Sequence, residues 1–486
     1  MSGIVAFGAY VPRLRLQRQA VFAATGWFNP ALKTLAKGER AMARWDEDAV
    51  TMAAEAARDC LAGVDRGDIT KVMLASTSLP FADRQNAGIV KEALNLADAV
   101  GTMDVTGSQR AGASALIDAL QGSATSGPVL CVASERRRAR PGSEAEMING
   151  DAAAAILVGP GEPLARLVAS YSIAVDFIDH FRSADKDFDY AWESRWAREE
   201  GYLKHAPAAV RGVLERAELT PADVDRFIMP APMRGVHEAV AKACGIASEA
   251  VADPLEATLG DCGAAQPLLM LARALAVAKP KERLLVIGFG QGCDALLLEV
   301  ARTAPATPDK LGVDGWLSRR KAETNYIKHL FFSGLIDLER GMRAEADQKT
   351  ALTALYRNRK AVLGLVGGRC SKTGVVQFPR SEISVAQNDR AVGTQEDYPL
   401  ADRRARIVTH TADNLTYTPE PPDYYGMIEF DGGGRMVTEF ADVEAADVDV
   451  GKPMRMMFRI KAFDERRGFR KYFWKAVPDY LAPSGQ

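Results

Sequence analysis

The chain of 486 residues is too long for one hydrophobic core and predicts about three domain-sized units. Hydrophobic residues make up 47% of it and charged residues 26%, as in ordinary soluble globular proteins. The net charge of −2 gives no electrostatic basis for binding nucleic acid or a membrane surface.

The six cysteines are scattered and form no CxxC pair, so neither a disulfide framework nor a zinc site is indicated. The N-terminal segment lacks a long apolar core, and no long apolar run follows it. We therefore expect a cytoplasmic protein that is neither exported nor membrane-spanning.

The first third of the chain alternates between short apolar runs and segments with helical periodicity. Uninterrupted apolar runs between helices are typical of parallel strands that are buried on both faces. This alternation predicts layers of helices and sheets. We expect strands at 4–10, 71–76, 128–133 and 150–159, and helices at 46–61 and 86–96.

A glycine-bounded turn, Gly107 to Leu116, opens a helix of small residues. A turn of this kind lifts one side chain to a helix N-terminus, where free N–H groups and the dipole can activate a thiolate or hold an oxyanion. The residue in that place is Gln109. The turn therefore has the form of a nucleophile elbow without a nucleophile.

The same order of elements occurs twice. The segment 67–74 has a counterpart at 222–229, and the strand at 128–133 has one at 284–290. The turn at Gly107 corresponds to the turn Gly260 to Ala265, which again precedes a helix. Three elements repeated in one order predict a duplicated α/β unit with pseudo-two-fold symmetry, whose two turns face a shared crevice.

The C-terminal part has a different character. After a charged helical connector, short apolar strands alternate with turns, and this pattern suits a small β-barrel. We expect strands at 361–366, 406–411, 425–430 and 454–460. The predicted domains are 1–165 and 166–308 for the two halves, 309–360 for the connector and 361–486 for the barrel.

Several motifs together resemble a known family. They are Gly8 to Pro12, Asp46 to Met52, Gly260-Asp261 and Gly288 to Gly292, in addition to the duplication itself. The two halves resemble the thiolase superfamily, in particular its 3-hydroxy-3-methylglutaryl-CoA synthase branch, and the barrel is similar to the OB-fold domains that accompany thiolase-like proteins. The resemblance implies a five-layer α/β/α/β/α fold, a coenzyme A thioester as substrate and a homodimer.

The catalytic residues of that branch do not carry over. Gln109 stands where the family has its acyl-accepting cysteine, Thr77 near its general-acid glutamate, Ile228 at its histidine and Asp261 at its asparagine. The resemblance therefore excludes an acyl-cysteine mechanism through the usual position.

The zinc ribbon that often accompanies such OB-fold domains is also degraded. Cys370 is kept, but Ser381 and Ser384 stand where a later cysteine pair would be. Structural zinc needs four good ligands, so we expect no metal.

Two helix N-termini that face one crevice could still stabilise an enolate. Thiolase-like aldolases that work with an OB-fold partner cleave β-hydroxyacyl-CoA by retro-aldol chemistry without the cysteine, and this chain resembles such an arrangement fused into one polypeptide. That reaction needs a base for the β-hydroxyl proton and an acid for the enolate.

Each candidate catalytic residue has a functional and a structural interpretation. His180 could be an acid or base or a satisfied structural histidine, and Asp261 a catalytic carboxylate or a helix N-cap. Cys262 could have a pKa lowered by the helix terminus or be a buried inert thiol. Tyr202 could donate a proton or pack in the core, and Gln109 could polarise a thioester carbonyl or be inert.

Further residues are candidates for contacts with the coenzyme A thioester: Gly260, Gly290, Gln291 and Arg182. The run Arg136 to Arg138 is either a solvated face or a set of phosphate contacts.

The favoured hypothesis is an acyl-CoA enzyme that cleaves or forms a C–C bond of a β-hydroxy- or β-ketoacyl-CoA, by retro-aldol or retro-Claisen chemistry. One alternative is synthase or thiolase chemistry at another thiol. The other is a non-catalytic scaffold that binds acyl-CoA.

Overall fold

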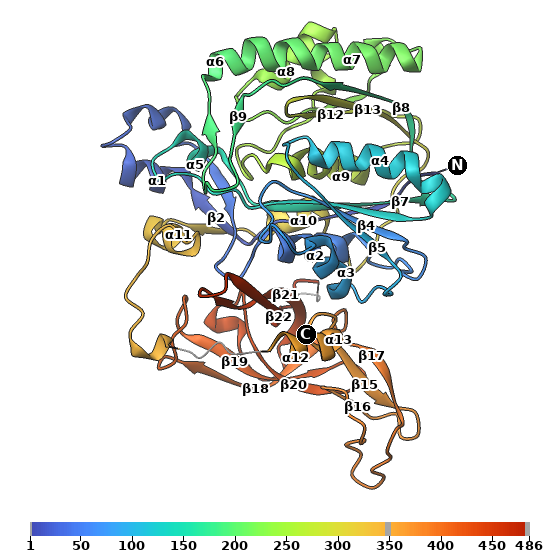
Figure 1. Cartoon of the computed structure of the whole chain (residues 1–486), viewed down its shortest axis with the longest axis vertical. Helices are drawn as coiled ribbons and strands as arrows, with labels where there is room; N and C mark the ends of the chain where they lie inside the picture. The colour runs from blue at the N-terminus through green and yellow to red at the C-terminus, as the bar shows by residue number, and fades with distance from the viewer. Residues whose placement is uncertain (1, 346–350, 482–486) are drawn as a thin grey trace. The chain divides into compact units, whose positions relative to one another are not determined.

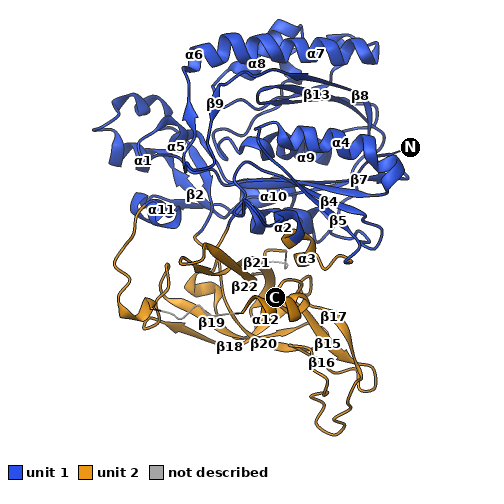
Figure 2. Ribbon diagram, viewed as in Figure 1, with its two compact units in different colours: residues 1–44, 48–88, 98–335 blue, residues 45–47, 89–97, 336–486 orange. Residues whose placement is uncertain are grey.

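The computed structural model describes residues 2–345 and 351–481. The chain forms two compact units, which Figure 2 distinguishes by colour. Unit 1 consists of residues 1–44, 48–88 and 98–335, and unit 2 of residues 45–47, 89–97 and 336–486. Each unit has its own sheets.

Unit 1 is built on a nine-stranded sheet in the order β11-β12-β13-β8-β1-β7-β6-β4-β5. Its two halves meet at a single pairing, Ile4 with Ala165. The strands are β1 (Ser2–Tyr10), β4 (Lys71–Ala75), β5 (Gly101–Val105), β6 (Val129–Glu135), β7 (Ala152–Pro160), β8 (Ala165–Ala174), β11 (Arg226–Ile228), β12 (Arg283–Phe289) and β13 (Gly292–Val300).

The two halves of this sheet repeat each other strand by strand. β4 runs parallel to β6, β6 antiparallel to β7, and β7 antiparallel to β1. In the same way, β11 runs parallel to β12, β12 antiparallel to β13, and β13 antiparallel to β8. The counterpart of edge strand β5 is reduced to one parallel bridge between Phe227 and Val251. The duplication that the sequence predicts is therefore present in the topology.

Figure 1 shows the layers of unit 1. Helices α7 (Leu203–Ala217) and α8 (Val236–Cys244) cover the half-sheet of β8, β12 and β13, and α4 (Ala111–Ser126) and α9 (Gln266–Val277) lie between the two half-sheets. Helices α2 (Ala49–Cys60) and α10 (Gly312–Ser318) cover the other half-sheet. The predicted five-layer α/β/α/β/α arrangement is confirmed.

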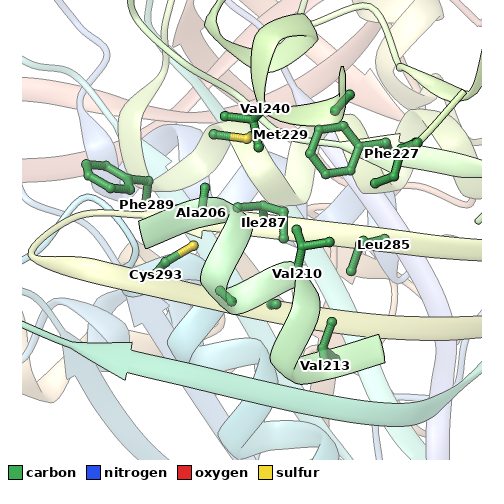
Figure 3. Close-up of a cluster of buried hydrophobic side chains, with 14 of the residues drawn as sticks. Ala206, Val210, Val213, Phe227, Met229, Val240, Leu285, Ile287, Phe289 and Cys293 are labelled. Atoms are coloured by element: carbon green, nitrogen blue, oxygen red, sulfur yellow. The ribbon is translucent and has the colours of Figure 1, made fainter. Parts of the chain in front are cut away.

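The outer layer of the second half encloses an apolar cluster between α7, α8 and strands β11 to β13. Alternate residues of β12, such as Leu285 and Ile287, face α7 because side chains on a strand point to opposite faces in turn. Figure 3 labels the central members of this cluster: Ala206, Val210, Val213, Phe227, Met229, Val240, Leu285, Ile287, Phe289 and Cys293.

The remaining elements of unit 1 are short. A three-stranded sheet joins β14 (Lys321–Glu323), β2 (Leu14–Gln17) and β3 (Glu39–Met42), and β9 (His180–Phe181) pairs with β10 (Tyr190–Ala191) in a hairpin. The short helices are α1 (Arg18–Thr25), α5 (Glu144–Ile148), α6 (Ser194–Trp196) and α11 (Tyr326–Phe332); α3 (Asn86–Ala93) spans residues of both units. No helix in the described part of the chain is long and apolar enough to cross a membrane.

Unit 2 contains a five-stranded sheet in the order β20-β19-β18-β21-β22. Its ends approach each other, because Phe440 bridges to Ala476 and the N–H of Ala441 donates to the carbonyl of Ala476 at 2.8 Å. This closure makes the predicted C-terminal β-barrel. Its strands are β18 (Ala405–Asp413), β19 (Asp423–Phe430), β20 (Arg435–Glu439), β21 (Pro453–Asp464) and β22 (Phe469–Pro478).

One predicted strand, at 361–366, is wrong. The segment ends helix α13 (Arg359–Val362), and the strand β15 (Val366–Cys370) begins only after Leu365, whose φ is +47°. A short apolar run does not distinguish a helix end from a strand. β15 pairs with β16 (Val376–Gln377) and β17 (Gln395–Pro399), and α12 (Leu352–Arg357) precedes it.

Cys370, which the resemblance likens to the one remaining ligand of a degraded zinc ribbon, ends strand β15 of this small sheet. Cys370 is buried, and its sulfur lies 3.1 Å from Oγ1 of Thr394. Within residues 2–345 and 351–481, no three His, Cys, Asp or Glu side chains are grouped as a metal site requires.

The contact between the two glycine turns of unit 1 can be tested on helix α4. A Cβ at Gly112 would lie 2.1 Å from the carbonyl oxygen of Ala264, whereas a Cβ at Gly122, in the same helix, would meet nothing within 4 Å. We expect Gly112→Ala to destabilise the protein by ~1–3 kcal/mol through overpacking. Gly122→Ala should stabilise it by ~0.5–1 kcal/mol. Denaturant unfolding of the full chain measures both changes, and equal effects would contradict the proposed close contact.

Candidate active site

Gln109 lies at the turn that precedes helix α4. Gly107 adopts a φ of +89°, which lets the chain reverse before the helix. The hydroxyl of Ser108 donates to the carbonyl of Gly290 at 2.9 Å. A Cβ at Gly290 would stand 3.0 Å from the backbone nitrogens of Gln109 and Arg110, so only glycine lets the second half come this close to the turn.

The two duplicated turns are in direct contact. A Cβ on Gly263, in the second turn, would stand 2.2 Å from Oε1 of Gln109. Gly263 has a φ of +49° and lies just before helix α9. The side chain at the tip of the first turn thus touches the backbone of the second, as the pseudo-two-fold arrangement requires.

A buried carboxyl group, Glu135, lies at the carboxyl end of β6. Its Oε1 accepts from the backbone N–H of Thr77 at 2.6 Å and from the Thr77 hydroxyl at 3.0 Å, and its Oε2 accepts from the Ser78 hydroxyl at 2.6 Å. Burial raises the pKa of Glu135, and the Arg137 charge and these hydrogen bonds only partly offset the rise. Glu135 therefore fills the space beside Thr77, where the resemblance places a catalytic glutamate.

Arg137 joins the two halves through a buried ion pair. Its Nη2 donates to Oδ2 of Asp261 at 2.6 Å and to the Asp261 carbonyl at 3.0 Å, and both side chains are nearly buried. Burial lowers the pKa of Arg137, but the charges of Asp261 and Glu135 outweigh it and keep the guanidinium protonated. Asp261 also accepts from the N–H of Gly263 at 3.2 Å, so it serves as a turn cap and as the partner of Arg137.

A hydrogen-bond chain links Gln109 to Glu135. Nε2 of Gln109 donates to Oγ1 of Thr77 at 3.2 Å, and the Thr77 hydroxyl donates to Glu135. The Thr77 hydroxyl gives its one proton to Glu135, and its oxygen accepts from Gln109. The chain fixes the orientation of the Gln109 amide.

His180 lies on the hairpin of β9 and β10 and is paired with Asp179. Its Nδ1 is 3.1 Å from Oδ1 of Asp179. Burial lowers the pKa of His180, but the adjacent carboxylate of Asp179 raises it above its ordinary value, and the charge of Arg137 acts in the opposite direction. The pairing leaves Nε2 of His180 as the nitrogen for proton transfer.

Arg182 links the same hairpin to the loop after β4. It donates to the carbonyl of Thr77 and forms a 2.7 Å ion pair with Asp189. Its guanidinium is thus engaged within the hairpin and with the loop after β4. Its predicted contact with a coenzyme A thioester stays a prediction.

Tyr202 and Cys262 are both buried. The ring of Tyr202 stacks on Phe289 with centroids 3.8 Å apart. Burial raises its pKa well above the ordinary value, and the charges of Asp179 and Asp261 add to the rise. Burial and the charge of Asp261 likewise raise the pKa of Cys262. Of the two interpretations of Cys262, the raised pKa favours the buried inert thiol, because the desolvation and the neighbouring carboxylates act against the thiolate.

The remaining predicted positions are part of the turns. Gly260 has a φ of +84°, and Gln291 has a φ of +48° in the turn between β12 and β13. The structure brings Gln109, Asp261, Gly260 and Gly290 together at the two turns.

Sequence reasoning missed Glu135, and it named Arg137 only as a member of the run Arg136 to Arg138. The run Arg136 to Arg138 is not a uniformly solvated face, because Arg137 is nearly buried and paired with Asp261, whereas Arg138 is exposed and pairs with Asp187. The ends of β4 and β6 meet because the two strands are parallel neighbours, so that the residues just after them lie at one edge of the sheet.

Comparisons with known proteins agree with this architecture. Residues 214–299 match the model for the C-terminal domain of 3-oxoacyl-[acyl-carrier-protein] synthase III, and residues 398–459 match the C-terminal OB-fold domain of ChsH2. A hydroxymethylglutaryl-CoA synthase of Aeropyrum pernix is 33% identical over 297 residues, which cover 60% of this chain and 82% of the relative. The chain belongs to the hydroxymethylglutaryl-CoA synthase family.

A second relative and two solved structures are also similar to this chain. The hydroxymethylglutaryl-CoA synthase of Caldivirga maquilingensis is 29% identical over 350 residues, covering 70% of this chain and 99% of the relative. A structure of HMG-CoA synthase complexed with CoA superimposes with a TM-score of 0.61 at 18% identity, covering 72% of this chain and 94% of that chain. Synthase III (FabH) from Pseudomonas aeruginosa PAO1 gives a TM-score of 0.57 at 20% identity and covers 63% of this chain and 99% of its own.

The pairing of His180 with Asp179 predicts a raised pKa of His180, which a titration can test. Because the folded pKa is raised, His180 keeps its proton to a higher pH than a free histidine, and the stabilisation from the pair is lost as the pH rises through that pKa. We expect Asp179→Asn to lower the pKa of His180 in an NMR titration. The control is Asp187→Asn on the same hairpin, which should leave it nearly unchanged. A His180 pKa unaffected by Asp179→Asn would contradict the assignment.

Proposed function

We propose that this protein cleaves, or in reverse forms, the Cα–Cβ bond of a β-hydroxy- or β-ketoacyl-CoA without an acyl-cysteine intermediate. The observation that supports this most directly is the occupant of the elbow, Gln109, which cannot accept an acyl group as a thiolate does. The membership of the family and the relative whose structure contains CoA support a coenzyme A thioester as substrate.

The other thiols of unit 1 are poorly suited to replace the missing nucleophile. The thiolate is the reactive form, and burial disfavours it. Burial raises the pKa of Cys60 and Cys131 to about 12 and that of Cys244 to about 11. The pKa values of Cys262 and Cys293 are raised as well. This argues against synthase or thiolase chemistry at another cysteine of the unit.

Retro-aldol cleavage of a β-hydroxyacyl-CoA needs no reactant other than the thioester itself. A base takes the β-hydroxyl proton, the Cα–Cβ bond breaks, and its electron pair passes to the thioester as an enolate while the β-carbon becomes a carbonyl. Protonation of Cα then gives the shortened acyl-CoA. A retro-Claisen reaction would in addition need a thiol or water nucleophile, and we therefore favour the retro-aldol version.

In this proposal, His180 takes the hydroxyl proton through Nε2 and returns it to Cα. Asp179 orients the ring and stabilises the imidazolium. The N-terminus of helix α4, at the elbow, supplies the positive end of a helix dipole for the enolate oxygen. We also propose a homodimer in solution, as the family resemblance implies.

Activity tests this proposal directly. The purified chain, incubated with a panel of β-hydroxy- and β-ketoacyl-CoA thioesters, should release a shortened acyl-CoA and a carbonyl product. His180→Gln should lower kcat by about 10²–10⁴-fold, the usual contribution of a general acid–base group. His410→Gln, in unit 2, is the matched control and should retain full activity. Tight acyl-CoA binding with no product from any thioester would instead favour a non-catalytic scaffold.

Mass spectrometry tests the absence of an acyl-enzyme. After exposure to acetyl-CoA, peptide mapping should find Cys60, Cys131, Cys244, Cys262 and Cys293 unmodified. Cys370 is mapped separately, because hydrogen bonds from Thr373 and Thr394 lower its pKa to about 6. An acyl group on Cys262 that turns over with substrate would contradict the proposal.

A further inference from the structure

Helix α11 brings a buried histidine against a buried arginine. His329 of α11 and Arg40 of strand β3 are both buried, and Nε2 of His329 lies 3.1 Å from Nη2 of Arg40. The same ring nitrogen lies 3.4 Å from Oε1 of Glu146, a buried carboxyl group of helix α5. This nitrogen therefore faces a donor and an acceptor, and its protonation decides which of the two it can bond.

The arginine requires His329 to be neutral. A guanidinium has only donors, so Nε2 must accept from Arg40 and cannot itself carry a proton. The ring proton is then on Nδ1, which lies 3.4 Å from the hydroxyl oxygen of Ser333. Burial lowers the pKa of His329, and the charge of Arg40 lowers it further. The carboxylates of Glu146 and Asp151 only partly offset this shift, so the neutral form persists at neutral pH.

Glu146 does not need His329 as a partner. The hydroxyl of Tyr326 lies 3.0 Å and 3.1 Å from its two oxygens, and the N–H of Gly142 donates to Oε2 at 2.7 Å. Burial and the charge of Glu146 raise the pKa of Tyr326, so the phenol keeps its proton for this bond. Because the carboxylate already has these donors, the neutral ring is left to accept from Arg40.

Protonation of His329 would reverse this arrangement. Nε2 would become a donor to Glu146 and could no longer accept from Arg40. The only other hydrogen bond of the Arg40 side chain among the described residues, from Nη1 to the carbonyl of Ala41, is long at 3.5 Å. Arg40 would then face an imidazolium across 3.1 Å inside the protein, where like charges repel strongly. The contact between α11 and β3 would open.

The same helix supports both parts of the elbow. Carbonyls at its C-terminal end accept from the two arginines that flank Arg137. They belong to Phe332, Ser333 and Gly334, and they lie 2.6 to 3.2 Å from Nη2 of Arg136 or Arg138. Arg40 lies against the second turn, where a Cβ on Gly260 would stand 3.1 Å from the Cβ of Arg40. Release of α11 would therefore loosen the first half and the second turn together.

We propose that α11 is a pH-sensitive clasp, which neutral His329 holds against Arg40 and which a proton on His329 releases. Release withdraws the support of the ion pair between Arg137 and Asp261. The stabilisation by the clasp is present in full above the ordinary histidine pKa of about 6.5. It is lost as the pH falls through the lower pKa that His329 has in the folded protein.

Hydrogen exchange of the full chain, followed by mass spectrometry, tests the clasp. The α11 peptide is compared at about pH 7.5 and about pH 5.5, after correction for the intrinsic exchange rate. We expect its opening equilibrium to rise about three- to tenfold, because uptake of one proton on opening gives at most about tenfold per pH unit. Unchanged protection of the α11 peptide in the unmodified chain would overturn the clasp.

Two variants separate His329 from other effects of acid. His329→Gln can still accept from Arg40 through its amide oxygen but takes up no proton, so α11 should stay protected at both pH values. His237→Gln is the matched control, because His237 is a second buried histidine of unit 1, on helix α8, and this variant should keep the response. If His329→Gln also keeps the response, another group titrates and the proposal is wrong.

An NMR titration of the histidines gives a measurement that does not depend on how well His329→Gln folds. We expect the pKa of His329 to lie below the ordinary value in the unmodified chain. Glu146→Gln should lower it further, because it removes a carboxylate that favours the imidazolium. A pKa of His329 at or above the ordinary value would overturn the clasp. Neither experiment measures turnover, so a failure of the proposed reaction would leave both results unaffected.

Discussion

The buried ion pair between Arg137 and Asp261 is the interaction on which the arrangement of the elbow depends. Taking two charges out of water is expensive, and their separation of 2.6 Å offsets much of that cost. Arg137 follows β6 in the first half, and Asp261 lies in the second turn of the other half. Loss of either partner would leave an uncompensated charge inside the protein, so the pair holds the two halves in one register.

Around this pair, the charges determine which groups can do chemistry. Asp261 and Glu135 keep Arg137 protonated, and the same carboxylates oppose ionisation of the Cys262 thiol. A site arranged in this way stabilises a guanidinium at the expense of a thiolate. The replacement of the nucleophile by Gln109 is therefore consistent with the electrostatics of the neighbouring residues, and it is not an isolated change in an otherwise unaltered synthase site.

The fold could be predicted from the sequence far better than the site. Apolar runs of strand length and one repeated order of elements identify the half-sheets. A strand that is buried on both faces appears in the sequence as an uninterrupted apolar run, which is easy to recognise. Glu135 gave no such signal, since it ends an apolar strand and is buried by residues that follow another strand. Arg137 stands in a run of arginines whose members have different environments. Only the three-dimensional pairing of β4 with β6 brings Thr77 to Glu135, and no local pattern records it.

Without a thiolate at the elbow, the helix N-terminus has a different role. In an enzyme that uses a thiolate there, the resident anion neutralises part of the positive end of the dipole. Here Gln109 is neutral, so that partial charge remains available to an anion that forms only during the reaction. An interaction that is stronger in the transition state than in the ground state is the kind that accelerates a reaction. A neutral amide at this place thus suits enolate chemistry, in which the negative charge appears on the substrate and never on the protein.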